Sequence, residues 1–190
     1  MANKKAAHAP SPALRLPTGS AATPTLLPGS PSASASPSTS TSAGKPLANY
    51  LSCKRVGDTL YISGVIAVDP NRRAVINSYD DLPAEAVAQL QSLGYATGQM
   101  SVDIFEAPAV CQSWFVLSRI QDIVQEQGGQ MRDVFKLVQY FRDLRQYPAY
   151  NRVRGLFCPE PVVSTVVEVS CMLPNDAVLI EVEATAWLGG

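Results

Sequence analysis

The chain has 190 residues, a formal net charge of −1 and only 16% charged residues. This balance lacks the positive excess that binds nucleic acid or an anionic membrane surface, so we expect neither as a partner. Apolar runs are only a few residues long, far below the roughly 20 needed to cross a bilayer, and we expect a soluble protein.

Cysteine and histidine usage limits the available chemistry. The four cysteines, at positions 53, 111, 158 and 171, are widely spaced and form no C-x-x-C pair. This pattern is typical of reduced thiols and favours a cytoplasmic location. The only histidine, His8, lies in a low-complexity region, which excludes histidine-based triads and zinc sites. We expect no metal or other cofactor and no activated cysteine nucleophile.

Residues 1–45 are rich in Pro, Ser, Thr, Ala and Gly, and they contain basic but no acidic residues. They lack the apolar side chains that offset the entropy of an ordered chain, so we predict a disordered extension. A cleaved organelle-targeting segment is the alternative, because such segments share this charge bias. Residues 46–190 are predicted to form one domain.

The domain is predicted to open with a β-hairpin. Two β-rich runs, residues 49–56 and 59–66, are separated by Gly57-Asp58, which suits a tight turn. Residues 69–100 show no clear period and are predicted to be a loop, with a short strand at residues 99–104.

A helix is predicted from Pro108 to the Gly128-Gly129 pair, because apolar residues recur along one side of it. A strand follows at residues 133–141. Its alternation predicts one face that carries Phe135, Leu137 and Phe141, and another face that carries Lys136 and Arg142.

A second helix is predicted from Pro148, with Tyr150, Val153 and Phe157 at helical spacing. Two strands follow at residues 164–172 and 178–187. Strands interrupted by two helices predict an α+β fold, in which both helices pack on one face of a mixed sheet.

The last strand separates two kinds of side chain. Val178, Ile180, Val182, Ala184 and Ala186 share one face, which a helix is expected to cover. The other face mixes Leu179 and Trp187 with two glutamates, so we expect it to meet another subunit. In the preceding strand, Cys171 shares the parity of Val167 and Val169 and is predicted to lie in the core.

Four segments, taken in this order, resemble the Rid/YjgF family over about residues 46–187. They are the hairpin from Tyr50 to Gly64, the segment from Tyr147 to Arg154, the strand from Ser164 to Ser170, and the strand from Val178 to Ala186. The resemblance implies a chorismate-mutase-like fold and a homotrimer that hydrolyses small enamines or imines in clefts between subunits. The Lys54-Arg55-x-Gly57-Asp58 hairpin is similar to the 2-aminomuconate deaminase branch, whereas the long segment at residues 71–104 leaves the substrate open.

The resemblance also implies a set of cleft residues. Glu181 is the expected catalytic residue, and the expected substrate-binding residues are Tyr50, Ser63, Gly64, Asn151 and Ser164. Three of these residues also have a simpler structural role. Tyr50 could be a packing residue, Asn151 could serve its own helix, and Glu181 could be a solvated strand residue.

Ser164 is the main departure from the family pattern. Catalytic members carry an arginine there, in a Pro-Ala-Arg-Ser type motif that grips the substrate carboxylate. A hydroxyl cannot replace that charged contact, which contributes about 1.5 to 3 kcal/mol. Three explanations remain: Arg142, Arg152 or Arg154 supplies the charge, the substrate lacks a carboxylate there, or the cleft binds without turnover.

The expected function is therefore hydrolytic deamination of a small enamine or imine, with Glu181 orienting water and relaying its proton. One alternative is a non-deaminating hydrolysis, hydration or tautomerisation in the same cleft. The other is a trimer that binds metabolites without catalysis.

Overall fold

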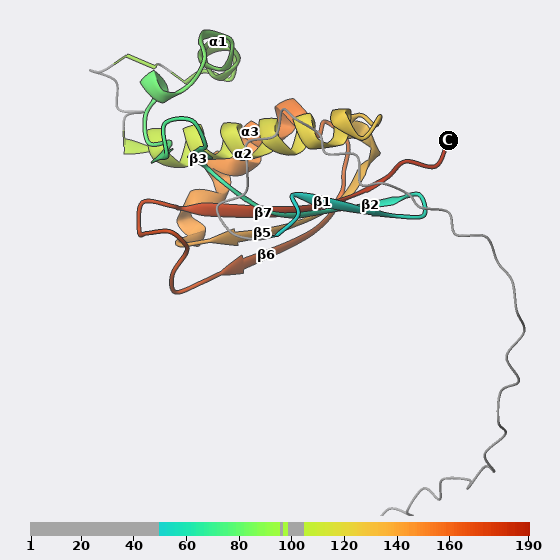
Figure 1. Ribbon diagram of the computed structural model, residues 1–190. Helices are drawn as coiled ribbons and strands as arrows, with labels where there is room; N and C mark the ends of the chain where they lie inside the picture. The colour runs from blue at the N-terminus through green and yellow to red at the C-terminus, as the bar shows by residue number, and fades with distance from the viewer. Residues whose placement is uncertain (1–49, 96, 99–104) are drawn as a thin grey trace, which may run out of the picture. The chain divides into compact units, whose positions relative to one another are not determined.

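The computed structural model describes residues 50–95, 97–98 and 105–190, which form a five-stranded sheet and a layer of helices (Figure 1). The predicted N-terminal extension and the predicted strand at residues 99–104 lie outside these residues. The sheet has the order β1-β2-β7-β5-β6. Its strands are β1 (Cys53–Val56), β2 (Thr59–Ile66), β5 (Val134–Phe141), β6 (Val163–Glu168) and β7 (Ile180–Trp187).

The sheet is mixed, as predicted. β5 and β6 run parallel, and the other neighbouring strands pair antiparallel. The parallel pair needs a crossover connection, which α3 (Tyr147–Phe157) provides. The hairpin of β1 and β2 turns at Gly57, whose φ of 61° is a conformation that glycine adopts without strain.

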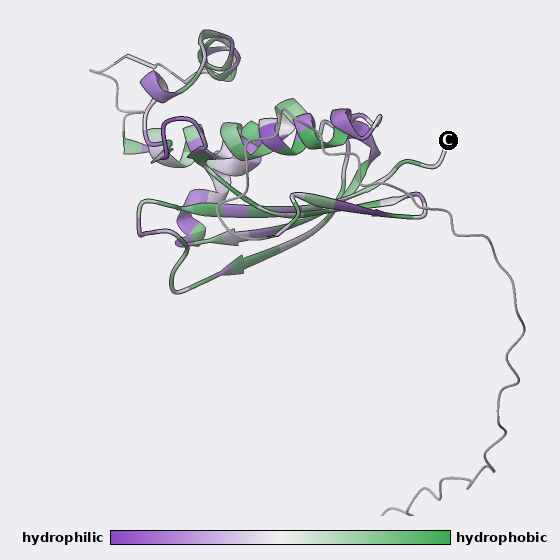
Figure 2. Cartoon of the chain, viewed as in Figure 1, coloured by the Kyte–Doolittle hydropathy of each residue, from purple (hydrophilic) through white to green (hydrophobic). Residues whose placement is uncertain are grey.

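Two helices, α2 (Ala107–Glu126) and α3, pack on one face of the sheet, which confirms the predicted α+β architecture (Figure 1). Apolar side chains of α2, such as Val116 and Leu117, are fully buried against this face. Figure 2 shows hydrophobic residues along both α2 and the strands beneath it. The sheet contributes the predicted inward-facing residues of β7, namely Ile180, Val182, Ala184 and Ala186.

The predicted face of β5 is wrong at Phe135, which is 44% exposed, whereas Val134 is buried. The pairing with β7 shifts between Val134 and Lys136, so Phe135 is an extra residue in the ladder. A bulge of this kind reverses the alternation on one side of the insertion. Leu137 and Phe141 lie after the bulge and are buried as predicted.

The predicted core position of Cys171 is also wrong. β6 ends at Glu168 rather than continuing to residue 172, and every residue of β6 is exposed. β6 is an edge strand that the helix layer does not cover, so its parity does not define a buried side. Cys171 is exposed in the following loop, while Cys111 and Cys158 are buried and Cys53 is partly buried; all four thiols are free.

The segment predicted to be a loop contains regular structure. It holds a small ribbon of β3 (Val68–Asp69) and β4 (Ala74–Val75), the 3-10 helix η1 (Tyr79–Asp81) and the helix α1 (Ala84–Ser92). Sequence periodicity missed α1 because the helix buries only Ala86 and Leu90, a single i, i+4 pair.

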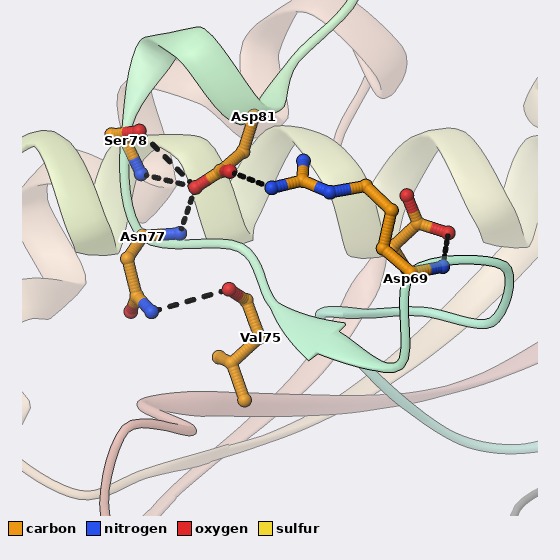
Figure 3. Close-up of polar contacts among 6 residues, drawn as sticks. Asp69, Val75, Asn77, Ser78 and Asp81 are labelled. Atoms are coloured by element: carbon orange, nitrogen blue, oxygen red, sulfur yellow. Dashed lines mark hydrogen bonds and ion pairs between the residues drawn. The ribbon is translucent and has the colours of Figure 1, made fainter.

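Asp81 organises this segment (Figure 3). Its carboxylate accepts hydrogen bonds from the backbone N–H of Asn77 at 2.9 Å and of Ser78 at 3.0 Å, and it pairs with Arg72 at 2.7 Å. Burial acts to raise the pKa of Asp81, but these contacts outweigh it and lower the pKa below 3.8. The charged aspartate therefore holds β4, η1 and the β3–β4 turn together.

Gln112 joins α2 to the start of β7. Its side chain is fully buried and donates from Nε2 to the Ala177 carbonyl at 2.7 Å. Its Oε1 accepts from the Leu179 N–H at 2.8 Å. A buried amide that satisfies two backbone groups fixes where β7 begins.

In the part of the chain that is described, no helix has the length and apolarity to span a membrane.

Candidate functional site

The candidate site lies on the sheet face opposite α2 and α3, which we call the open face and which carries Tyr61, Lys136, Tyr140, Glu181 and Glu183. The strand pairing arranges these side chains in rows across the sheet. One row pairs Tyr140 of β5 with Glu181 of β7. The next pairs Val138 with Glu183, and a third runs from Lys136 through Thr185 to Tyr61 and Lys54. The site is therefore built from four strands.

Glu181 lies over a glycine. The pairing of β2 with β7 shifts between Ile62 and Val65, so Ser63 and Gly64 form an irregularity opposite Glu183. A Cβ on Gly64 would overlap the Glu181 carboxylate and lie 3.0 Å from its Cγ. The glycine thus lets the acidic side chain lie flat on the neighbouring strand.

Burial, and to a smaller extent the neighbouring Glu183 carboxylate, raises the pKa of Glu181 above its ordinary value of 4.5. Perturbed carboxylates of this kind are typical of sites that transfer protons, because a pKa closer to neutrality suits both halves of the transfer. Among the residues that the structure describes, Glu181 has no hydrogen-bond donor, so its carboxylate remains available to a ligand.

Glu183 is held by Tyr140. The Tyr140 hydroxyl donates to Glu183 Oε1 at 3.2 Å. Burial, followed by the Glu183 charge, raises the pKa of Tyr140 and keeps its hydroxyl protonated. The two glutamates on this face therefore differ. The Glu183 carboxylate accepts a hydrogen bond from the Tyr140 hydroxyl, whereas the Glu181 carboxylate does not.

Two hollows open on this face. The first has a volume of about 610 Å³ and contains Tyr50, Ser63, Gly64, Lys54 and Lys136 in its lining. The second has a volume of about 280 Å³ and is lined by Glu181, Tyr140, Cys171 and neighbouring residues. Glu183 lines both hollows and so marks their boundary.

The structure brings four of the predicted site residues together. Tyr50, Ser63 and Gly64 line the first hollow, and Glu181 lies against Gly64 at its edge. The Ser63 hydroxyl donates to the Leu51 carbonyl at 2.7 Å, so this side chain fixes the chain leading into β1.

Ser164 and Glu181 do not meet within one chain. Ser164 pairs with Leu137, a buried residue of the helix-covered side, and exchanges a hydrogen bond with the Gln139 side chain at 3.2 Å. Asn151 is exposed on α3, which lies on the same covered side. Contact of these two residues with Glu181 would require a second subunit.

Two of the three arginines proposed to supply a charge are already engaged. Arg142 pairs with Asp176 at 2.6 Å. Arg152 donates to the Leu93 carbonyl at 2.6 Å and lies over the Tyr95 ring, 4.4 Å from its centroid. Arg154 is partly buried, and its Nε has no hydrogen-bond partner. None of the three lines either hollow.

Sequence reasoning missed Tyr140, Glu183, Lys54 and Lys136 as site residues. Alternation along β5 places Lys136 and Tyr140 on one face, and that signal was present in the sequence. Their meeting with Lys54 and Glu183 depends on cross-strand register, which the sequence does not show. No group of three or more His, Cys, Asp or Glu side chains among the residues described could hold a metal ion.

The mixed sheet, its two covering helices and the acidic open face define an α+β protein of the chorismate-mutase-like class. The chain belongs to the endoribonuclease L-PSP family, also called the Rid/YjgF or RutC family, whose model matches residues 40–188. This family membership confirms the resemblance to the Rid/YjgF family, whereas the similarity to the 2-aminomuconate deaminase branch stays a prediction.

The relatives agree with this assignment. A RutC family protein from Pyrococcus abyssi is 30% identical over 76% of this chain and 91% of its own length. The 3-aminoacrylate deaminase RutC of Acinetobacter baylyi is 25% identical over 74% of this chain and 88% of its own.

Solved structures show the same fold. A Klebsiella pneumoniae protein, provisionally named an endoribonuclease, is 51% identical, has a TM-score of 0.67, and matches 74% of this chain and 100% of its own. RidA from an Antarctic Psychrobacter is 20% identical, with a TM-score of 0.56 over 76% of this chain and 93% of its own, and supports the fold alone.

Proposed function

We propose that this protein is a hydrolytic deaminase that acts on a small enamine or imine. The observation that carries the proposal is Glu181, a half-buried carboxylate with a raised pKa that lies over Gly64 at the edge of a hollow. Family membership and the deaminase name of the Acinetobacter relative support it. A 2-aminomuconate-like compound is the finer substrate proposal, and it rests on the hairpin resemblance alone.

In this mechanism, the Glu181 carboxylate takes a proton from water while the water oxygen attacks the carbon of the C=N bond. The protonated Glu181 then returns that proton to the nitrogen, which gives a carbinolamine. Glu181 next takes the proton of the new hydroxyl and passes it to the amino nitrogen, and ammonia leaves as the carbon–oxygen double bond forms. An enamine first takes a proton on carbon to become the imine. Partial burial strengthens the polar contacts of the reacting groups. Tyr140 holds Glu183 and keeps that second carboxylate from competing for the same proton.

We also propose that the active form is a homotrimer. The open face exposes apolar side chains, including Trp187 at 53% and Val163 at 63%. Packing against another subunit would cover these side chains and would bring a neighbour's Ser164 or Asn151 toward Glu181.

The endoribonuclease term in the family description favours a different substrate, but the site does not support RNA. Glu181 and Glu183 occupy the middle of the open face, and the chain carries a net charge of −1. Proteins that bind RNA use basic surfaces, which two adjacent carboxylates at the centre of the site do not provide.

A non-deaminating reaction is the second candidate. Ser164, which replaces the family's carboxylate-binding arginine, is hydrogen bonded to Gln139 and makes no charged contact. Hydration or tautomerisation of another small unsaturated compound would need only Glu181 and the hollow. A trimer that binds without catalysis would need neither proton transfer nor a water.

The test measures ammonia release from enzymatically generated 2-iminopropanoate and 2-aminomuconate, with the spontaneous rate subtracted. We expect Glu181→Gln to lower kcat by about 100-fold or more, the usual contribution of a general acid–base group. Glu160→Gln, a change of an exposed glutamate outside both hollows, should leave the rate unchanged. Equal rates for wild type and Glu181→Gln would remove Glu181 from the mechanism.

A further inference from the structure

We propose that Lys54 and Lys136 form an anion-binding subsite in the first hollow, and that the substrate carries a carboxylate which these two ammonium groups hold. This inference rests on the proposed function, because it names the chemical class of the substrate for the same site. It also assigns the positive charge that Ser164 does not provide.

The strand register places the two lysines in one row. Lys54 pairs with Tyr61, Tyr61 with Thr185, and Thr185 with Lys136. Their Cα atoms are separated by three strand spacings, about 14 Å at 4.7–4.9 Å each. Both side chains line the same hollow, so they approach a ligand above Tyr61 and Thr185 from opposite sides.

The charges around the hollow favour an anion. Lys54 and Lys136 are the only lysines among the residues that the structure describes, and both line it. Neither ammonium group belongs to any ion pair found in the described ranges. The acidic residue in the lining is Glu183, and its carboxylate already accepts a hydrogen bond from Tyr140. Two cations against one carboxylate leave the lining of the hollow net positive, and the Glu181 carboxylate lies at its edge beside Gly64.

The subsite also lies at a useful distance from the reacting group. On β5, Lys136 and Tyr140 are four residues apart, about 13 Å along a strand, and Tyr140 pairs with Glu181. Glu181 leans onto Gly64, which lines the same hollow as the lysines. A carboxylate bound between the lysines would therefore place the reacting carbon near Glu181 when several bonds separate the two groups, as in a 2-aminomuconate-like compound.

The test compares crotonate with crotonamide, two unreactive ligands of nearly the same shape that differ in charge. Isothermal titration calorimetry on the full-length protein should show crotonate binding about tenfold more tightly, as expected for a ligand with two charge-assisted hydrogen bonds. The preference should decrease as salt is added, because the lysines are exposed.

Three variants complete the test. The double variant Lys54→Met and Lys136→Met should bind both ligands equally, and the matching double change to arginine should keep the preference. Arg132→Met, an exposed charge change outside the hollow, should behave as the wild type does. Equal binding of the two ligands by the wild type, or a preference that survives the double methionine change, would overturn the subsite. Because no turnover is measured, these outcomes are separate from those of the deaminase assay.

Discussion

At the residue scale, Gly64 controls the position of the Glu181 carboxylate. We expect Gly64→Ala to displace the Glu181 side chain, since the added Cβ would overlap its carboxylate rather than any backbone atom. Deaminase kcat should fall by about tenfold or more, with only a small change in the free energy of unfolding, because the flexible end of a glutamate can move.

Gly155→Ala is the matched control: its Cβ meets nothing within 4 Å. That variant should retain activity and gain roughly 0.5–1 kcal/mol in helix α3. A fully active Gly64→Ala would contradict the assigned position of Glu181.

The raised pKa of Glu181 predicts a pH dependence of stability. Folding favours the protonated carboxyl, so the stability that it contributes is present below the ordinary pKa of 4.5 and is lost as pH rises through the higher folded-state pKa. Glu181→Gln cannot ionise, and its stability relative to the wild type should therefore increase with pH across that window. Urea unfolding of both proteins, from pH values below 4.5 to neutrality, measures the difference. A difference that stays constant with pH would show that folding does not shift this pKa.

At the element scale, Gln112 is the connection between α2 and β7. Gln112→Leu would leave the Ala177 carbonyl and the Leu179 N–H without their partner, and each unsatisfied buried group costs about 1–3 kcal/mol. We expect a loss of roughly 2–5 kcal/mol in urea unfolding. Gln125→Leu changes an exposed glutamine of the same helix and should shift stability by less than about 0.5 kcal/mol. Similar stabilities for the two variants would rule out this role.

The elements also show how far sequence patterns lead. Alternation identified the buried side of β7, and helical spacing identified Tyr150, Val153 and Phe157, because a helix layer and a central strand each have one covered side. Strand alternation gave the wrong side for Phe135, because one inserted residue in β5 reverses which side chains face the helices. It also failed at Cys171, because the preceding edge strand β6 has no side that the helices cover. Glu181 was predicted as a site residue from the family resemblance, a role that stays a prediction. The row from Lys54 to Lys136 was not predicted, since it depends on the register of four strands.

At the scale of the whole molecule, the exposed apolar part of the open face predicts assembly. Light scattering should give a mass about three times the 20.3 kDa of one chain. Val167→Glu, on the open-face side of β6 beside Tyr140, should shift the mass toward a single chain, because an unpaired charge would be buried at the interface. Leu144→Glu, a similar change at an exposed residue outside the sheet, is the control. A wild-type protein with the mass of one chain would contradict the homotrimer.

The place of β7 in the sheet has a consequence for biosynthesis. β7 is the last strand in sequence, yet it lies between β2 and β5 and pairs with both. On the ribosome, β2 and β5 emerge well before residues 180–187 and have no partner between them until those residues leave the exit tunnel. The nascent chain must therefore carry unpaired strand edges until β7 emerges, and contact with chaperones in that interval would protect it against aggregation.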